Sequence, residues 1–96
     1  MSKKIYCTAQ FQPKPGQEDA LFAVLQALEP NTLREDGCLQ YIVTRHRSSP
    51  FAEGESLPIV FHEIWADQAS FEAHCQRTEI QQFFQRHCVD ADGLNN

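Results

Sequence analysis

The first regular pattern along the chain is an alternation of apolar and polar positions over residues 5–12. Successive side chains of a β-strand point to opposite faces, so this period of two predicts a strand with one buried face. The two prolines and the glycine of 13–16 are expected to end it, because proline removes a backbone donor and glycine permits a turn. The apolar spacing then changes to three and four, which predicts a helix with an inner face of Leu21, Val24, Leu25 and Leu28.

Pro30 is expected to kink or interrupt this helix. Beyond it, Thr32 and Glu35 have the spacing of a capping box that would begin a short new turn, and Gly37 is a typical helix terminator. A second strand is predicted over 38–47, with Leu39, Tyr41 and Val43 on one face and Ile42 on the other.

Residues 47–58 contain two prolines, a glycine and three serines, which predicts a long exposed loop. The strongest strand pattern of the chain follows over 59–65. One face of this strand is expected to carry Ile59, Phe61, Glu63 and Trp65, and the other Val60, His62 and Ile64.

Asp67 is a suitable N-cap for a helix with an inner face of Phe71, His74, Cys75 and Thr78. A second capping-box spacing at Thr78 predicts a break there, before another apolar stripe made by Ile80, Phe83, Phe84 and His87. Residues 90–96 are polar and are expected to fray.

The predicted order is β-α-β-β-α, the helix broken once and no fourth strand predicted. A split β-α-β unit of this kind indicates an α+β, ferredoxin-like fold, an antiparallel sheet with helices on one face. We expect a single domain over 1–96. A chain of this length has a thin core, and the helices would leave one sheet face bare, so a symmetric homodimer through the sheet faces is expected.

Composition excludes several classes of protein. Thirteen acidic residues against eight lysines and arginines give a net charge of −5, which argues against binding to nucleic acid or to an anionic membrane. The chain has no apolar run long enough to span a membrane and no visible secretory signal, so we expect a cytoplasmic protein. The four cysteines are scattered without a CxxC pair, and we interpret them as small buried apolar residues with no metal site.

Candidate chemistry centres on Glu63 and His74. Burial raises the pKa of a carboxyl group, and a carboxyl so shifted is a usable acid or base near neutral pH. His74 follows eleven positions later on the helix that returns over the same sheet face, so carboxylate, imidazole and the Trp65 indole are expected to meet in one apolar pocket. Such a pocket suits a planar, ionisable ligand. Tyr41 would add a phenol, with Glu63 or His74 as its hydrogen-bond partner.

Each residue also has a purely structural interpretation. His74 beside Phe71 has the position of a satisfied core histidine, and Trp65 that of a large core aromatic. Glu63 has a possible cross-strand partner in Arg45 or Arg47. On the residues alone, the functional pocket and the structural interpretation both stay open.

At these residues the sequence resembles the antibiotic biosynthesis monooxygenase family, which includes quinol monooxygenases. The matching pieces are Phe11 with Pro15-Gly16, the run 35–41, and Phe61-x-Glu63-x-Trp65 continuing to Phe71-x-x-His74, within residues 4–88. The resemblance implies a ferredoxin-like protomer, a homodimer closed through its sheets as a dimeric α+β barrel, and a pocket between sheet and helices. Family members usually end in a fourth strand, which this pattern lacks.

The resemblance also implies an activity. Many members oxidise quinol or phenolic compounds with molecular oxygen and need no metal, haem or flavin. Carried over, Glu63, Trp65 and His74 match the motif that lines the pocket, and Tyr41 matches its strand-two aromatic. We expect His74, oriented by Glu63, to remove a hydroxyl proton from a small aromatic ligand. Trp65, Tyr41, Phe61 and Phe71 are expected to bind the substrate.

Three other functions stay open. Some relatives are isomerases of a phosphorylated signalling sugar, for which Lys4, Arg45 and Arg47 are the candidate phosphate ligands. Haem-degrading relatives use an asparagine on the first strand, where this chain has Thr8 and Gln10. A dimer that binds a metabolite without converting it is the non-enzymatic alternative.

Overall fold

A computed structural model describes residues 3–51 and 54–96; Met1 and Ser2 of the basic start, and positions 52–53 of the predicted loop, lie outside this description. The elements follow the order β1 (Ile5–Phe11), α1 (Glu18–Gln26), α2 (Glu29–Leu33), β2 (Cys38–Arg45), β3 (Ile59–Trp65), α3 (Gln68–Cys75) and α4 (Thr78–Phe84). A π-helical turn, η1 (Gln85–Val89), extends α4.

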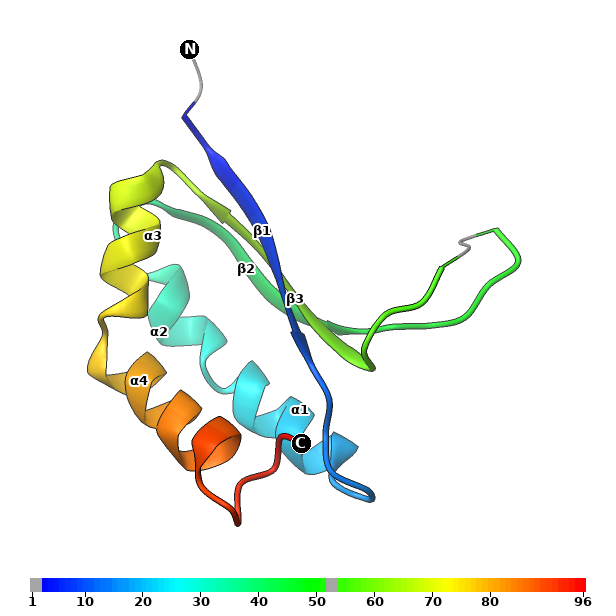
Figure 1. The fold of residues 1–96 in the computed structure, drawn as a ribbon. Coiled ribbons are helices and arrows are strands. Elements are labelled where there is room, and N and C mark those ends of the chain that lie inside the picture. Colours follow the sequence, from blue (N-terminus) through cyan, green and yellow to red (C-terminus); the bar gives the residue numbers. More distant parts are fainter. Residues whose placement is uncertain (1–2, 52–53) are drawn as a thin grey trace.

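The three strands form one antiparallel sheet in the order β1-β3-β2, and the four α-helices cover one of its faces (Figure 1). The central strand β3 pairs with both neighbours, so that Glu63 lies opposite Cys7 on one side and Tyr41 on the other. The α+β, ferredoxin-like prediction is therefore confirmed.

Alternation along β1 and β3 gives the pattern of burial that the sequence predicts. The helix-facing positions of β3, Ile59, Phe61, Glu63 and Trp65, are all buried. Strand β2 departs from the prediction, because its register with β3 shifts between Cys38 and Gln40. The bulge adds one residue there, so Leu39 is exposed and Cys38 packs against the core in its place, whereas Tyr41 and Val43 keep the predicted buried face.

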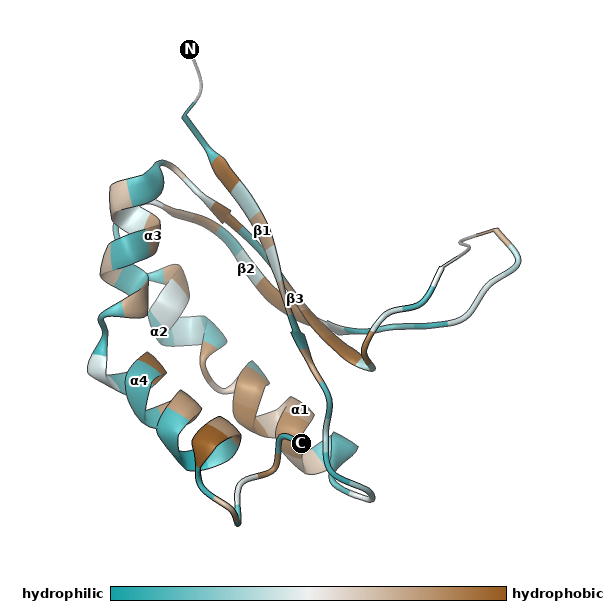
Figure 2. Cartoon of the chain, viewed as in Figure 1, coloured by the Kyte–Doolittle hydropathy of each residue, from teal (hydrophilic) through white to brown (hydrophobic). Residues whose placement is uncertain are grey.

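The core lies between the sheet and the helix layer. Hydrophobic residues recur along α1 and β3, whereas α3 is mostly hydrophilic (Figure 2). The buried cluster consists of Phe11, Leu21, Leu25, Leu28, Tyr41, Val43, Ile59, Phe61, Trp65, Ile80 and Phe83.

The predicted helix boundaries are mostly confirmed, but the two capping boxes are wrong. Pro30 lies in the first turn of α2, where its missing N–H costs little, and α1 ends before it. Thr32 lies inside α2 and is fully buried, so it is not a cap. Asp67 caps α3 by accepting from the Ser70 N–H at 2.8 Å. The break before Thr78 is present, but the residue at the N-cap, Arg77, makes no side-chain cap bond.

The prediction that the polar C-terminal segment frays is wrong. Backbone hydrogen bonds join this segment to η1, from Asn95 N to His87 O at 3.0 Å, and to the turn after β1, from Lys14 N to Leu94 O at 2.9 Å. Gly93 is buried against η1, where a Cβ would collide with the backbone of Arg86 and His87. Composition alone predicts fraying, but these backbone bonds hold the segment beside the end of β1.

The second face of the sheet has no helix over it (Figure 1). Tyr6 and Ile42 are exposed on this face, as is His62 between them in the strand order. The connection between β2 and β3 extends away from the sheet, and Phe51 within it is almost fully exposed. In the part of the chain that the structure describes, each helix is too short or too polar to cross a bilayer.

Candidate functional site

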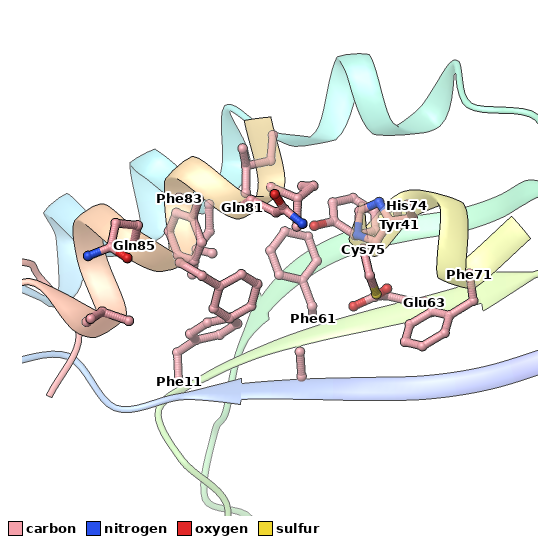
Figure 3. Close-up of a pocket in the computed structure, with 16 residues that line it drawn as sticks. Phe11, Tyr41, Phe61, Glu63, Phe71, His74, Cys75, Gln81, Phe83 and Gln85 are labelled. Carbon is pink, nitrogen blue, oxygen red and sulfur yellow. The ribbon is translucent and has the colours of Figure 1, made fainter. Parts of the chain in front are cut away.

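A cavity of about 410 Å³ lies between the sheet and the helix layer (Figure 3). At one end Tyr41, Glu63 and His74 lie close to one another. The other end lies between Phe11 and Phe83, with Gln85 beside it, and Gln81 lies between the two ends. Phe61, between the two ends, and Phe71 also line the cavity. The predicted site residues thus line one cavity, except Trp65, which lies behind the cavity wall.

Strand pairing explains why two of these groups meet. Tyr41 and Glu63 are direct partners in the β2–β3 ladder, and both point to the helix side because the pleat alternates. Both are buried. A carboxylate in such a place needs hydrogen-bond partners, because burial without them carries a large desolvation cost.

Glu63 finds its partners on the strands and not on the helix. Its Oε1 accepts from the Trp65 indole N–H at 3.0 Å. The Cys7 thiol, opposite it on β1, is a further hydrogen-bond partner. Burial, then the charge of Glu63, raises the pKa of Cys7 from 9.0 to about 11, so this thiol stays protonated at neutral pH. No bond to Arg45 forms, because Arg45 pairs with Glu18 and Asp19 of α1 at 3.0 and 2.8 Å.

His74 has a different carboxylate partner from the one predicted. Its Nδ1 lies 3.0 Å from Oε2 of Glu35, in the connection between α2 and β2. The prediction that Glu63 orients His74 is therefore wrong. The imidazole packs between two aromatic rings, with centroid distances of 4.6 Å to Trp65 and 5.2 Å to Tyr41. Since Glu35 accepts the Nδ1 proton, Nε2 of the neutral ring is left as an acceptor.

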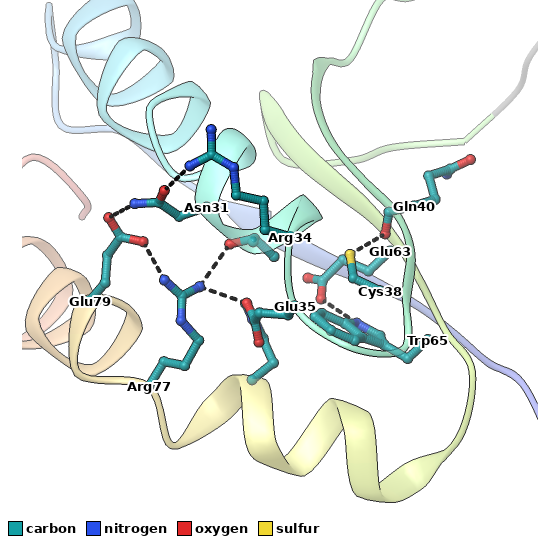
Figure 4. A network of polar contacts seen from close by, with 11 residues as sticks. Asn31, Arg34, Glu35, Cys38, Gln40, Glu63, Trp65, Arg77 and Glu79 are labelled. Atoms are coloured by element: carbon teal, nitrogen blue, oxygen red, sulfur yellow. Dashed lines mark hydrogen bonds and ion pairs between the residues drawn. The ribbon is translucent and has the colours of Figure 1, made fainter.

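Arg77 completes a network behind the cavity (Figure 4). Its guanidinium donates to Glu35 Oε2 at 2.6 Å, to Glu79 Oε1 at 2.8 Å and to Thr32 Oγ1 at 3.3 Å. Burial tends to lower the pKa of Arg77, but the bonds to Glu35 and Glu79 more than offset this, and the net shift is upward. Arg77 therefore stays charged and neutralises the Glu35 carboxylate.

The phenol of Tyr41 stays protonated across the ordinary pH range. Burial, followed by the charges of Glu63 and Glu35, raises its pKa well above the ordinary value, and a hydrogen bond with the Thr32 side chain opposes this rise. The predicted partners of this hydroxyl were Glu63 and His74. Thr32 is its partner instead, inside α2, where the sequence predicts a cap.

Three network residues, Thr32, Glu35 and Arg77, are not among the predicted site residues. Glu35 is the first residue of the run 35–41 that carries the family resemblance, and this position is the feature of the sequence that points to it. Cys75 also differs from its interpretation as a small buried residue, because it is exposed and lines the cavity. Within residues 3–51 and 54–96, no three histidine, cysteine or acidic side chains are grouped as a metal site would need.

Comparison with known proteins identifies the family. The family model of antibiotic biosynthesis monooxygenases matches residues 4–86. The chain belongs to this family. The match covers the sheet, the helix layer and the polar residues of the cavity and its network, from Thr32 to Gln85.

Solved structures agree with this assignment. Protein SO0527 from Shewanella oneidensis is 35% identical, with a TM-score of 0.77 over 90% of this chain and 78% of that one. PA3566 from Pseudomonas aeruginosa is 27% identical, with a TM-score of 0.76 over 100% of this chain and 87% of that one. A Chloroflexus aurantiacus protein, described as a candidate antibiotic biosynthesis monooxygenase, is 25% identical over 82% of this chain and 71% of that one, with a TM-score of 0.57. No curated protein matches the chain.

Proposed function

We propose that this member of the antibiotic biosynthesis monooxygenase family oxidises a small quinol or phenolic compound with molecular oxygen, using no metal, haem or flavin. The observation that supports it is the 3.0 Å contact of His74 Nδ1 with Glu35 at the polar end of a mostly apolar cavity. This contact prepares Nε2 to accept a proton in a place from which a bound ring excludes water. Membership of a family of monooxygenase-like proteins supports the same reaction.

The two ends of the cavity fix how such a ligand would bind. The hydroxyl group lies at the His74 and Tyr41 end, where both side chains offer hydrogen bonds. The ring lies against Phe61, and any apolar substituent extends between Phe11 and Phe83. A volume of about 410 Å³ is within the range usual for small-molecule sites.

The reaction begins with transfer of the substrate hydroxyl proton to His74. The electron-rich anion passes one electron to O₂, and the resulting ring radical and superoxide combine to form a carbon–oxygen bond. The peroxide takes the proton back from the imidazolium. Loss of the hydrogen on that carbon breaks the O–O bond, which releases water and leaves a carbonyl. The product has one more oxygen and two fewer hydrogens than the substrate, and the second oxygen atom of O₂ becomes water.

Oxygen uptake with a panel of substituted hydroquinones, in the presence of a chelator, tests this proposal. Incorporation of one atom from ¹⁸O₂ into the product identifies a monooxygenase. His74→Ala is expected to lower the rate by about 10²–10⁴, the usual contribution of a general base. His46→Ala is the matched control, because His46 is exposed at the start of the β2–β3 connection and does not line the cavity. Equal oxygen uptake by His74→Ala and wild type would show that His74 is not the base.

The alternative functions receive less support from the described residues. No lysine or arginine is among those that line the cavity, and the guanidinium of Arg45 is paired with two acidic residues of α1. A sugar-phosphate isomerase would need a cation near the ligand's phosphate. A dimer that binds the same aromatic ligand without turnover would retain the affinity and show no oxygen uptake.

We further propose that two copies associate through the uncovered sheet face. Tyr6 and Ile42 leave apolar area exposed there, which supports burial against a second copy. Light scattering after size exclusion tests this, with Ile42→Asp expected to give a monomer. Leu33→Asp, an exposed leucine on the helix side, is the control. The four cysteines are free thiols, which supports a cytoplasmic location as part of the proposal.

A further inference from the structure

Arg77 lies outside the cavity, yet it contacts the partners of both polar groups that line it. It shares Oε2 of Glu35 with His74, at 2.6 Å and 3.0 Å respectively. It also donates to Oγ1 of Thr32 at 3.3 Å, and Thr32 is the hydrogen-bond partner of Tyr41. Arg77 therefore links the partner of Tyr41 to the partner of His74. Figure 4 shows its guanidinium between Glu35 and Glu79.

Arg77 can only donate hydrogen bonds, and this sets the direction of the bonds on either side of it. On one side Glu35 accepts from Arg77 and from His74, so the Nδ1 proton of His74 is fixed and Nε2 is an acceptor. On the other side Thr32 Oγ1 accepts from Arg77 and turns its own proton toward Tyr41. The phenol proton of Tyr41 is then free to point into the cavity.

We propose that Arg77 is a positioning residue that makes His74 an acceptor and Tyr41 a donor, so that the cavity selects ligands with a hydroxyl group. Such a hydroxyl accepts from Tyr41 and donates to His74, whereas a methyl ether has no proton to donate. The inference deepens the proposed function, because it concerns the same cavity and explains how a phenol is preferred there.

The position of the Arg77 guanidinium supports the same arrangement. It lies 2.6 Å from Glu35 Oε2, the oxygen that also contacts His74 Nδ1 at 3.0 Å. Arg77 therefore holds this carboxylate in place as the acceptor for the Nδ1 proton.

The test compares 2-naphthol with 2-methoxynaphthalene by titration calorimetry under nitrogen, so that no turnover occurs. Wild type is expected to bind the naphthol about tenfold more tightly than the ether at pH 7, as one or two hydrogen bonds to the hydroxyl would give. In Arg77→Gln the preference is expected to fall below about threefold at pH 7, with the affinity for the ether unchanged.

Two further variants separate positioning from folding. Arg77→Lys keeps the charge beside Glu35 but cannot reach all three partners, so it is expected to show an intermediate preference for the naphthol. Arg86→Gln is the control, because this arginine pairs with the exposed Asp92 at 3.0 Å, and it should behave as wild type.

Unchanged preference in Arg77→Gln at pH 7 would overturn the proposal. So would an equal loss of affinity for naphthol and ether, because a merely structural arginine would act on both. A failure of the proposed oxidation would give a different result, because wild type would still prefer the naphthol to the ether but would take up no oxygen.

Discussion

Glu35 and His74 are 39 positions apart in the chain, and their side chains meet at 3.0 Å behind the cavity wall. The contact joins the α2–β2 connection to α3, so it exists only when the helix layer has closed over the sheet. Glu63, the carboxylate that lines the cavity, accepts from the Trp65 indole, and among the described residues the ion pair of His74 is with Glu35.

Glu35→Gln tests whether this contact serves the proposed reaction. The amide is nearly isosteric but uncharged, so it stabilises an imidazolium less than the carboxylate does. We expect oxygen uptake with the best hydroquinone to fall by roughly 10- to 100-fold, with a smaller change in KM. Glu79→Gln is the control, because Glu79 also pairs with Arg77 but does not touch His74. Equal losses in the two variants would assign the effect to Arg77 and not to the imidazole.

The bond between Trp65 and Glu63 is expected to matter for stability before it matters for activity. Trp65→Phe removes the indole donor and leaves a buried carboxylate without one of its partners, which costs about 1–3 kcal/mol of unfolding free energy. Glu63→Gln keeps an acceptor oxygen for the indole and should cost less. Urea denaturation measures both. A larger loss for Glu63→Gln than for Trp65→Phe would contradict this account of the pair.

The sequence predicts the sheet well because the pleat alone decides which face a side chain takes. Phe61, Glu63 and Trp65 fall on one face for any register that keeps β3 a regular strand. The break at Pro30 and the cap at Asp67 follow from local backbone chemistry in the same way. The prediction that Leu39 is buried is wrong because a bulge adds one residue to β2, and the pattern of apolar residues does not show where a bulge occurs.

The sequence predicts which residues line the candidate site but not which hydrogen-bond partners they have. Glu63, Tyr41 and His74 reach one cavity, because strand register and the return of α3 place them there. Which carboxylate orients His74 depends on the path of the α2–β2 connection, a tertiary property. Glu35 and Arg77 lie on connections between elements, where the hydrophobic periodicity does not show which way a side chain points.

Gly37 controls the path of that connection, and its replacement is the third prediction. It has a φ of +81°, and a Cβ built on it would collide with the Ser70 side chain on α3. Gly37→Ala is therefore expected to cost roughly 1–3 kcal/mol and to reduce oxygen uptake by moving Glu35 away from His74.

The double variant Gly37→Ala with Ser70→Gly removes the collision but keeps the unfavourable φ. It should recover only part of the stability lost in the single variant, as urea denaturation would show. Gly16→Ala provides a control, because its φ is +76° and a Cβ there would meet nothing within 4 Å. If Gly37→Ala lost no more stability than Gly16→Ala, the close approach to Ser70 would not be important.

Thiol reactivity should reflect the buried environment around Glu63. Burial raises the pKa of both Cys7 and Cys38 from 9.0 to about 11. A rise of two units leaves about a hundredfold less thiolate at pH 8 than a free cysteine has, and the thiolate is the reactive form. Mass spectrometry after brief iodoacetamide treatment at pH 8 is expected to find Cys75 labelled first, since it is exposed. Labelling of Cys7 ahead of Cys75 would contradict the packing described for β1.

Acidification should weaken the fold through His87, which holds the C-terminal segment. Burial, then the charge of Arg86, lowers its pKa below the ordinary 6.5, and the neutral Nδ1 accepts from the Leu94 N–H at 3.4 Å. Because the unfolded chain binds this proton more readily, the free energy of unfolding falls as the pH drops through 6.5, and the loss levels off once the folded protein is protonated too. His87→Gln keeps an acceptor but cannot titrate, so its unfolding free energy should change less between pH 7.5 and 5.5 in urea titrations. His46→Gln, on the exposed β2–β3 connection, is expected to keep the wild-type dependence. An unchanged dependence in His87→Gln would show that other groups cause it.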